Sequence, residues 1–289
     1  MYSSRLYSPL RYPGGKARFA PFITNLIQAN GLAGGVYCEP YAGGAGVALD
    51  LLFHGVASEV HINDADPAVS AFWRAATQHT HGLIDLVMNA PLTMDDWHHW
   101  RNAMLTQEEA DPIKLGFATL FMNRTSRSGI LKGGVIGGKQ QQGSYKLHDR
   151  FDREMLAKRL LKIGQHAKAI HVHQEDALAL LGRCHRLLPA NRSLIYLDPP
   201  YYVKGQGLYR NYYHHGDHEA IARTLQSKRF NRHWIVSYDD APQIHAMYSG
   251  ATASIYQLNY SAQKRYHGSE AMFFDPRLFV KDVLNTLAA

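Results

Sequence analysis

The sequence predicts an α/β protein with a mixed, mainly parallel sheet that is interrupted by a basic insert. Short apolar strands alternate with helices towards both ends of the chain, and the excess positive charge gathers in the middle. The length of 289 residues, with 46% of them hydrophobic, suits a folded chain that buries a sizeable core. We expect a first core part at 1–81, an insert at 82–164 and a second core part at 165–289.

The first core part has a strand–turn–helix–strand order, which is typical of parallel sheets. Its expected elements are, in order, helix 19–31, strand 36–39, helix 47–54, strand 60–63 and helix 67–80. The first strand runs into the Gly-rich turn PYAGGAG, and the second ends at Asp64. Both of these strand ends should lie at the carboxyl edge of the sheet, where open α/β proteins bind their ligands.

The insert combines helices with a polar, Gly-rich stretch. Helices are expected at 95–105, 112–122 and 151–163, and the last of these is basic and amphipathic. Two glycine pairs flank Val135 and Ile136, a pattern that predicts a β-hairpin. We therefore expect a helical insert that carries a short ribbon.

The second core part returns to alternating strands and helices. Apolar strands are expected at 169–173, 193–197 and 233–237, with helices at 177–187 and 217–228 between them. A final strand pair near 253–260 and 270–274 completes the sheet.

The positive charge of the chain is concentrated in one region. The chain has 31 Lys and Arg against 24 Asp and Glu, a net charge of +7. Residues 114–164 alone hold 11 basic and 3 acidic residues, a net of +8. Such a local field attracts a polyanion, of which nucleic acid is the usual example, although a solvated basic face without a partner is the alternative.

The remaining composition excludes several classes of protein. No apolar run is long enough to span a bilayer, and the first residues lack the apolar stretch of a secretory signal. The two cysteines, Cys38 and Cys184, make neither a disulfide framework nor a zinc motif. We expect a cytoplasmic protein with no membrane partner.

The Gly-rich turn and Asp64 together indicate a site for a nucleoside. Glycines allow the backbone to approach a ligand closely, and a carboxylate at the end of the second strand can accept hydrogen bonds from ribose hydroxyls. The dinucleotide pattern GxGxxG is absent, which counts against NAD, and Gly14-Gly15-Lys16-Ala17 lacks the residues of a phosphate-binding loop. Alone, this pattern is also compatible with an ordinary turn.

The segment Asp198-Pro199-Pro200-Tyr201 follows a buried strand and is the most specific motif in the chain. Two consecutive prolines fix the backbone and leave carbonyl groups free to accept hydrogen bonds. Asp198 and the Pro199 carbonyl can therefore receive both hydrogens of an NH2 group, while the Tyr201 ring can stack on a flat base. The alternative is a rigid turn with a buried tyrosine.

These motifs resemble those of the Dam-like DNA adenine-N6 methyltransferase family, and they occur in the family's order over nearly the whole chain. The matching segments are Arg11–Lys16, Glu39–Gly46, Ile62–Asp64, Met122–Arg124, Asp198–Tyr201, Ser237–Asp239 and Ser269–Ala271. The resemblance implies a Rossmann-like core that uses S-adenosyl-L-methionine. It also implies a site-specific adenine methyltransferase, EC 2.1.1.72, which flips its target base out of double-stranded DNA.

The resemblance also implies roles for individual residues. The catalytic residues would be Asp198, Pro199, Pro200 and Tyr201. The cofactor-binding residues would be Tyr12, Lys16, Glu39, Tyr41, Gly43, Asp64, Asp176 and Asp198. One departure is Ala45, where the family usually has glycine; alanine is small, so we expect cofactor binding to survive.

The DNA-reading residues are expected in the insert. They would be Asn123, Arg124, Arg127, Lys132 and Lys139, because Arg and Lys can read guanine in the major groove. The best-known GATC methylase of the family has an aromatic residue at the position of Arg127 and an arginine at that of Lys132. We therefore expect adenine methylation at a target other than GATC.

Several alternatives stay open at this point. The same two acceptors would serve cytosine N4, an RNA adenine or a protein glutamine, and a catalytically silent DNA-binding protein is a rival of another class. The 17 histidines form no zinc-protease motif, and adjacent pairs such as His98-His99 have diverging side chains, so we expect no metal. We further expect a monomer, with a cognate restriction or defence system as its partner.

Overall fold

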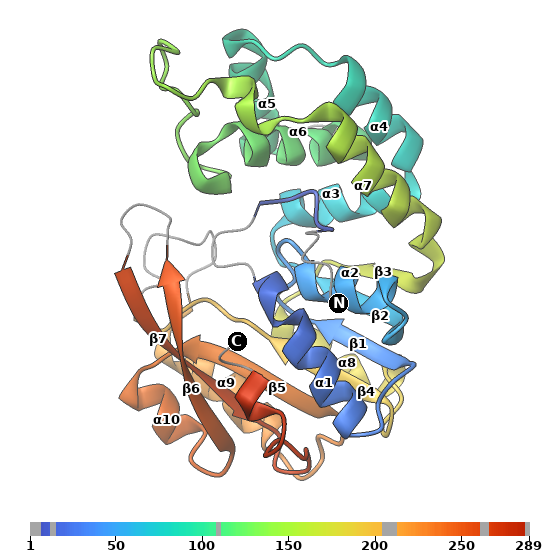
Figure 1. The fold of residues 1–289 in the computed structure, drawn as a ribbon, viewed down its shortest axis with the longest axis vertical. Coiled ribbons are helices and arrows are strands. Elements are labelled where there is room, and N and C mark those ends of the chain that lie inside the picture. Colours follow the sequence, from blue (N-terminus) through green and yellow to red (C-terminus); the bar gives the residue numbers. More distant parts are fainter. Residues whose placement is uncertain (1–6, 12–15, 108–110, 204–212, 261–265, 287–289) are drawn as a thin grey trace.

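The computed structural model describes residues 7–11, 16–107, 111–203, 213–260 and 266–286. Its centre is a seven-stranded sheet with the order β3-β2-β1-β4-β5-β7-β6 (Figure 1). The strands are β1 Gly35–Glu39, β2 Ala57–Asn63, β3 Ile170–His173, β4 Ser193–Leu197, β5 His233–Asp239, β6 Thr252–Tyr260 and β7 Tyr266–Phe274. Strands β1 to β5 pair in parallel, whereas β7 lies antiparallel between β5 and β6.

The chain reverses its direction of winding between β1 and β4. The order runs outward from β1 to β3 on one side and from β4 to β5 on the other. In open α/β sheets, the carboxyl ends of the strands at such a reversal form the ligand-binding crevice. The predicted mixed, mainly parallel sheet of a Rossmann-like core is confirmed.

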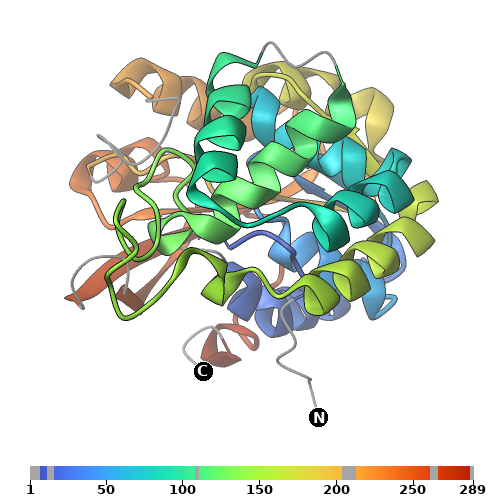
Figure 2. The same ribbon diagram turned by 90° about the horizontal axis from the view of Figure 1, so that it is seen from above.

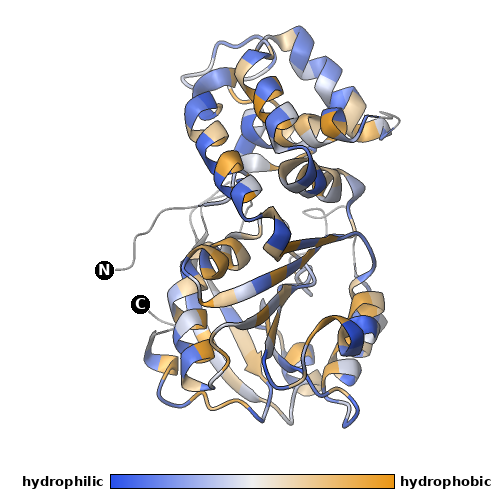
Figure 3. Ribbon diagram, turned by 90° about the vertical axis from the view of Figure 1, so that its right-hand side faces the viewer, coloured by the Kyte–Doolittle hydropathy of each residue, from blue (hydrophilic) through white to orange (hydrophobic). Residues whose placement is uncertain are grey.

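Helices cover both faces of the sheet because alternate residues of each strand point to opposite faces. One face packs against α1 Ala20–Ala29, α2 Gly46–Phe53 and α3 Pro67–Gln78. The other packs against α8 Ala177–Leu187, α9 His215–Leu225 and α10 Pro242–Met247. In β4, for example, Tyr196 belongs to the first core, while Ile195 and Leu197 belong to the second. The strands accordingly carry a high share of hydrophobic residues (Figure 3).

Four helices of the insert stand over the carboxyl edge of the sheet (Figures 1 and 2). They are α4 Thr80–Asn89, α5 Met94–Thr106, α6 Pro112–Thr125 and α7 Arg153–Gln165. Carboxylate N-caps start α6 and α7, at Asp111 and Asp152, and a capping box starts α5 at Thr93. Short 3-10 turns complete the fold at Lys16–Phe19, Arg127–Gly129, Leu147–Arg150, Ala167–Ala169 and Leu284–Thr286.

Helix α3 joins the insert to the core. Gly116 of α6 lies so close to α3 that an added Cβ would meet the Ala75 Cβ at 2.7 Å and the Ala71 carbonyl oxygen at 2.9 Å. The hydroxyl of Thr119 donates to the Ala68 carbonyl at 2.9 Å. A single hydrophobic cluster runs from the sheet through Trp73 of α3 into the insert.

The structure adds one helix to the predicted elements and corrects one expectation. The expected helix 67–80 corresponds to α3, and after a break near His79 a separate helix follows, α4, which was not predicted. The predicted β-hairpin around Val135 and Ile136 is wrong, because among the described residues of this stretch there is one isolated antiparallel bridge, Ser126–Val135. Val135 and Ile136 are buried, and the positive φ angles of Gly137 and Gly138 turn the chain away after them.

Among the described residues, none of the helices combines the length and the apolar character that crossing a lipid bilayer requires.

Candidate active site

Acidic side chains gather where the parallel strands end. Glu39 closes β1, Asp64 follows β2, Asp176 follows β3 and Asp198 follows β4. Because these strands are parallel and adjacent, the four carboxylates lie along one edge of the sheet, as the sequence predicted.

Lys16 lies at the centre of this edge and is almost fully buried. Its Nζ atom is 3.2 Å from Asp198 Oδ1 and 3.1 Å from Glu270 Oε2. Glu270, on β7, also accepts from the Tyr201 hydroxyl at 2.5 Å and from the Tyr256 hydroxyl at 2.6 Å. One buried ammonium group therefore links the carboxylate after β4 to a carboxylate on an antiparallel strand.

The charges of this cluster stabilise one another. Desolvation on its own would lower the pKa of Lys16, but the carboxylates of Asp198 and Glu270 raise that pKa above its usual value. Desolvation raises the pKa of Asp198, and Lys16 and Ser237 act against that rise. Lys16 therefore stays protonated at neutral pH and favours the ionised form of Asp198.

Neighbouring strands fix the position of Asp198 and of the turn after it. The Ser237 hydroxyl donates to Asp198 Oδ1 at 2.8 Å. Asp239 accepts from the backbone N–H groups of Tyr202 at 2.7 Å and Val203 at 2.8 Å. Pro199 and Pro200 have no N–H group to compete, so this turn is held from β5.

The Gly-rich turn packs against the end of β2. The Gly43 N–H donates to Asp64 Oδ2 at 3.1 Å, and the Trp73 indole donates to the Gly43 carbonyl at 2.9 Å. Gly43 and Ala45 both have positive φ angles, 45° and 46°. Ala45 thus adopts a left-handed conformation that favours glycine. This conformation explains why a glycine would be preferred at the position where this chain has alanine.

Two carboxylates in this region have strongly raised pKa values. Burial raises the pKa of Glu39 to about 8, although the Tyr37 hydroxyl and the Ala48 N–H oppose the rise. Desolvation raises the pKa of Asp64 to about 7. Carboxylates perturbed in this way are typical of sites where a bound ligand supplies the missing donors or positive charge.

Asp176 joins the same edge through two tyrosines. The Tyr41 hydroxyl donates to the Tyr213 hydroxyl at 3.1 Å, which in turn donates to Asp176 Oδ2 at 3.5 Å. Asp176 also caps α8 by accepting from the Leu178 N–H at 2.8 Å. Predicted residues that are 135 positions apart are therefore brought together, whereas Tyr12 lies outside the described residues.

The five predicted DNA-reading residues divide into two groups. Arg127, Lys132 and Lys139 are exposed in the segment that follows α6. Asn123 and Arg124 are buried at the end of α6 and bind the N-terminal segment instead. The polar atoms of these two residues face the protein in this structure, so their role in reading DNA stays a prediction.

Asn123 uses its whole amide group within the protein. Its Oδ1 accepts from the Arg11 N–H at 2.7 Å, and its Nδ2 donates to the carbonyls of Arg11 and Gly129, each at 2.9 Å. Arg124 donates from Nε to the Pro9 carbonyl at 2.7 Å, and its buried Nη2 has no hydrogen-bond partner among the described residues.

Three residues of the site were not assigned a function from the sequence. Glu270, Ser237 and Asp239 lie in segments that resemble family motifs, yet no local pattern assigned them a role. The signal that identifies them is strand pairing, since β5 lies between β4 and β7. This pairing brings Ser237 to Asp198, Asp239 to the turn after Asp198 and Glu270 to Lys16.

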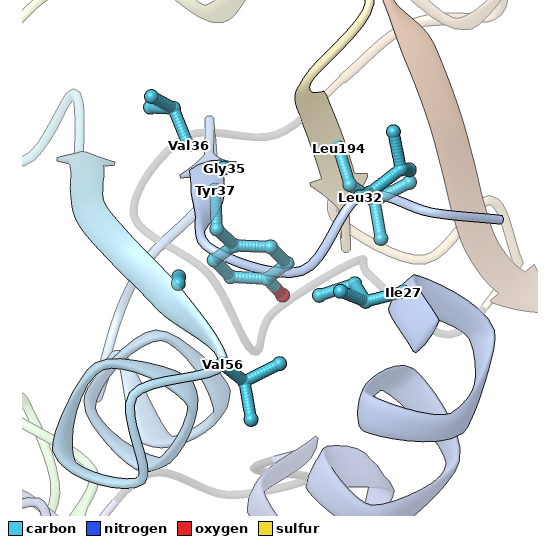
Figure 4. A pocket seen from close by; sticks show the side chains of 8 residues that line it. Ile27, Leu32, Gly35, Val36, Tyr37, Val56 and Leu194 are labelled. Carbon is cyan, nitrogen blue, oxygen red and sulfur yellow. The ribbon is translucent and has the colours of Figure 1, made fainter. Parts of the chain in front are cut away.

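A crevice at the opposite end of β1 offers no comparable chemistry. It lies between α1 and the sheet and is lined by apolar side chains with the Tyr37 ring among them (Figure 4). The Tyr37 hydroxyl already donates to Glu39 at 3.1 Å. We assign this crevice no ligand.

Comparisons with known proteins agree with the motifs. Residues 12–263 match the family described as D12 class N6 adenine-specific DNA methyltransferase. A search of curated proteins finds no match to the chain. Among solved structures, a candidate class I S-adenosylmethionine-dependent methyltransferase from Listeria monocytogenes aligns with a TM-score of 0.40 and 11% identity. That alignment covers 95% of this chain and 64% of the other.

Proposed function

Because the chain belongs to the D12 class N6 adenine-specific DNA methyltransferase family, we propose that it is an active, site-specific DNA adenine methyltransferase. The family match supports the predicted class of reaction, adenine-N6 methylation of DNA, for which S-adenosyl-L-methionine would be the cofactor. The observation that carries the proposal for this chain is Asp198, held at the end of β4 by Lys16 and Ser237 next to the Gly-rich turn.

The residues at the sheet edge fit this cofactor. Burial raises the pKa values of Glu39 and Asp64, and the cofactor carries an ammonium group and ribose hydroxyls that would stabilise their ionised forms. Asp64 and Gly43 would hold the ribose side, while Asp176 and Tyr41 would line the adenine side. When bound, S-adenosyl-L-methionine supplies a methyl group activated by a sulfonium.

Asp198 and the Pro199 carbonyl would act on the target amine. The exocyclic nitrogen of adenine is a weak nucleophile because its lone pair is delocalised into the ring. Two acceptors that take both N–H bonds draw this nitrogen towards a tetrahedral shape and stabilise the positive charge that develops on it. Asp198 is fixed from two sides, so it is positioned before the base arrives.

Tyr201 is more buried than its expected role, stacking on the target base, would require. It is 6% exposed, with its hydroxyl bound to Glu270 and its ring centre 5.4 Å from the Lys16 ammonium. A target base flipped from the duplex would contact only the exposed edge of this ring, so we propose that Tyr201 shapes the pocket wall and fixes Lys16.

DNA would bind to the insert at 82–164, which we propose as the target-recognition region. Arg127, Lys132 and Lys139 are exposed there and are suited to base or phosphate contacts. The buried Nη2 of Arg124 lacks an acceptor, and the pKa of this guanidinium is lowered to about 9 by desolvation, so it is still charged at neutral pH. A DNA acceptor would satisfy it after a local rearrangement.

A methyl-transfer assay with tritiated cofactor tests the proposal. The substrates are duplex DNA, single-stranded RNA and duplex DNA in which cytosine is the only base with an exocyclic amine that could accept the methyl group. We expect label on adenine in duplex DNA, at a sequence other than GATC, and its loss in Asp198→Ala with DNA binding retained. The matched control is Asp282→Ala, an exposed aspartate outside the insert. Transfer to RNA or cytosine would favour the alternative substrates, and cofactor binding without transfer to any of them would favour a silent DNA-binding protein.

The remaining predictions go beyond the family match. They are the EC number 2.1.1.72, a cytoplasmic location, a monomeric state and a restriction or defence system as the partner. Sequencing methylated sites in DNA from expressing cells, together with the molar mass in solution, would check the target and the monomer.

A further inference from the structure

Three histidines and a glutamate meet at the β2–β3 edge of the sheet. His61 of β2 stands opposite His171 of β3 in the parallel register, and Asn63 stands opposite His173. Side chains of paired residues share a face, so Glu59, two positions before His61, lies on that face as well. This cluster is distinct from the candidate active site around Lys16 and Asp198.

The cluster has the donor geometry of a metal site. Glu59, His61 and His171 each offer one ligand atom, and these three atoms lie within 4.8 Å of one another. Among the described residues, these three therefore form a candidate metal-binding group. The rings of His61 and His171 stack, with centroids 4.5 Å apart and planes 27° apart. Ligand atoms around one tetrahedral ion are about 3.4 Å apart, so modest side-chain rotations would close the group.

The surroundings of His61 orient it as metal-binding histidines are oriented. Its Nδ1 forms a hydrogen bond of 3.0 Å with Nε2 of His173. Metal ligands typically engage their second ring nitrogen in such a bond, which fixes the tautomer and the ring plane. Glu175 lies 4.0 Å from His173 and is itself paired with Arg183 at 3.2 Å, so the supporting residue is also held.

The site is accessible from solvent, although His61 itself is buried. The side chains of His171 and Glu59 are 40% and 50% exposed, and they form a 2.9 Å ion pair at the surface. An ion can enter from solvent by replacing that contact.

We propose that Glu59, His61 and His171 form a binding site for a divalent transition ion, with Zn²⁺ as the best fit. Two imidazoles and one carboxylate are a borderline donor set that suits Zn²⁺ and disfavours Mg²⁺ or Ca²⁺, which prefer oxygen ligands alone. Water would complete the coordination on the exposed side. The expectation of no metal rested on the absence of a zinc-protease motif and on adjacent histidine pairs, and it did not consider residues brought together by strand pairing.

The ion would connect the edge strand to the cofactor end of the sheet. Strand β3 is the outermost strand, and it pairs only with β2 among the described strands. Just beyond the cluster, the Asn63 amide donates to the Glu175 carbonyl at 2.9 Å and accepts from the Glu175 N–H at 3.0 Å. A metal that clamps β3 to β2 would therefore steady the loops that carry Asp64 and Asp176.

The test uses the full-length, tag-free protein after removal of metals with a chelator. Isothermal titration with ZnCl2, a thermal-unfolding scan with and without Zn²⁺, and the visible spectrum with Co²⁺ are measured for wild type and variants. His171→Ala and Glu59→Gln replace exposed side chains, so they should fold. His81→Ala, an exposed histidine outside the cluster, is the matched control.

We expect one Zn²⁺ per chain, a rise in the unfolding temperature and a Co²⁺ spectrum of low coordination number. Affinity should fall at least tenfold in His171→Ala and Glu59→Gln, and stay unchanged in His81→Ala. Absence of Zn²⁺ binding at roughly 100 µM, or equal affinity in His171→Ala and wild type, would overturn the site. None of these readouts depends on methyl transfer, so they are independent of the proposed function.

Discussion

Replacing Glu270 by glutamine removes a buried negative charge while keeping the size of the side chain. Glu270 is fully buried, pairs with Lys16 at 3.1 Å and accepts from two tyrosine hydroxyls at 2.5 and 2.6 Å. Breaking a buried ion pair from one side costs about 3–5 kcal/mol. Lys16 keeps Asp198 at 3.2 Å, so we expect the lower end, a loss of about 3 kcal/mol in the free energy of unfolding.

The same substitution should also slow methyl transfer. With Glu270 neutral, the Lys16 ammonium has Asp198 as its remaining carboxylate, and it would hold more tightly the oxygen that the target amine needs. We expect kcat to fall by about tenfold or more while the KM for DNA changes little, because no DNA contact is altered. Urea unfolding and steady-state methyl transfer measure the two effects.

Glu154→Gln is the matched control, since Glu154 is 81% exposed and its oxygen is 4.0 Å from Lys158. A surface pair of this kind contributes little, so the control should match wild type. An unfolding free energy for Glu270→Gln within about 0.5 kcal/mol of wild type would refute the view that Glu270 is the buried counter-charge of Lys16.

Three further predictions concern other parts of the molecule. In the proposed cofactor site, ionised Asp64 would accept from ribose hydroxyls. Burial raises the pKa of Asp64 to about 7, so cofactor affinity should fall about tenfold from pH 8 to pH 6 by calorimetry, but not in Asp64→Asn. Gly116→Ala should lower the free energy of unfolding by about 1–3 kcal/mol, because the added Cβ would meet the Ala71 carbonyl oxygen at 2.9 Å. Gly182→Ala, at a position in α8 with open space around it, should instead raise the free energy of unfolding in urea by up to about 1 kcal/mol. Asn123→Ala should cost about 2–3 kcal/mol in urea unfolding because it leaves Arg11 and Gly129 backbone groups unpaired, and an unfolding free energy within about 0.5 kcal/mol of wild type would refute this structural role.

The sequence predicted the carboxylate edge because the rule that places it is local. Each of Glu39, Asp64 and Asp198 follows an apolar strand directly, and parallel strands bring their carboxyl ends together whatever the distance in sequence. Lys16 was matched by motif, and its 3.2 Å contact with Asp198 supports that match across 182 positions.

Features that depend on strand pairing or burial could not be predicted in this way. Glu270 stands opposite Asp239 and Tyr256 because of the antiparallel register of β7, which no single segment encodes. The His61–His171 pair has the same origin in the parallel register. Helix α6 is apolar around most of its surface, so the sequence could not indicate that Asn123 and Arg124 face inward.

The inward position of Asn123 joins the turn after α6 to the N-terminal segment. Its amide holds the backbone of Arg11 on one side and of Gly129 on the other. Gly129 ends the turn that begins at exposed Arg127. If DNA binds at Arg127, as proposed, a movement of that turn would reach the Arg11 backbone through the Asn123 amide. Direct contact of Asn123 with a base would break these three hydrogen bonds, so the buried asparagine is better suited to linking the two segments than to reading a base.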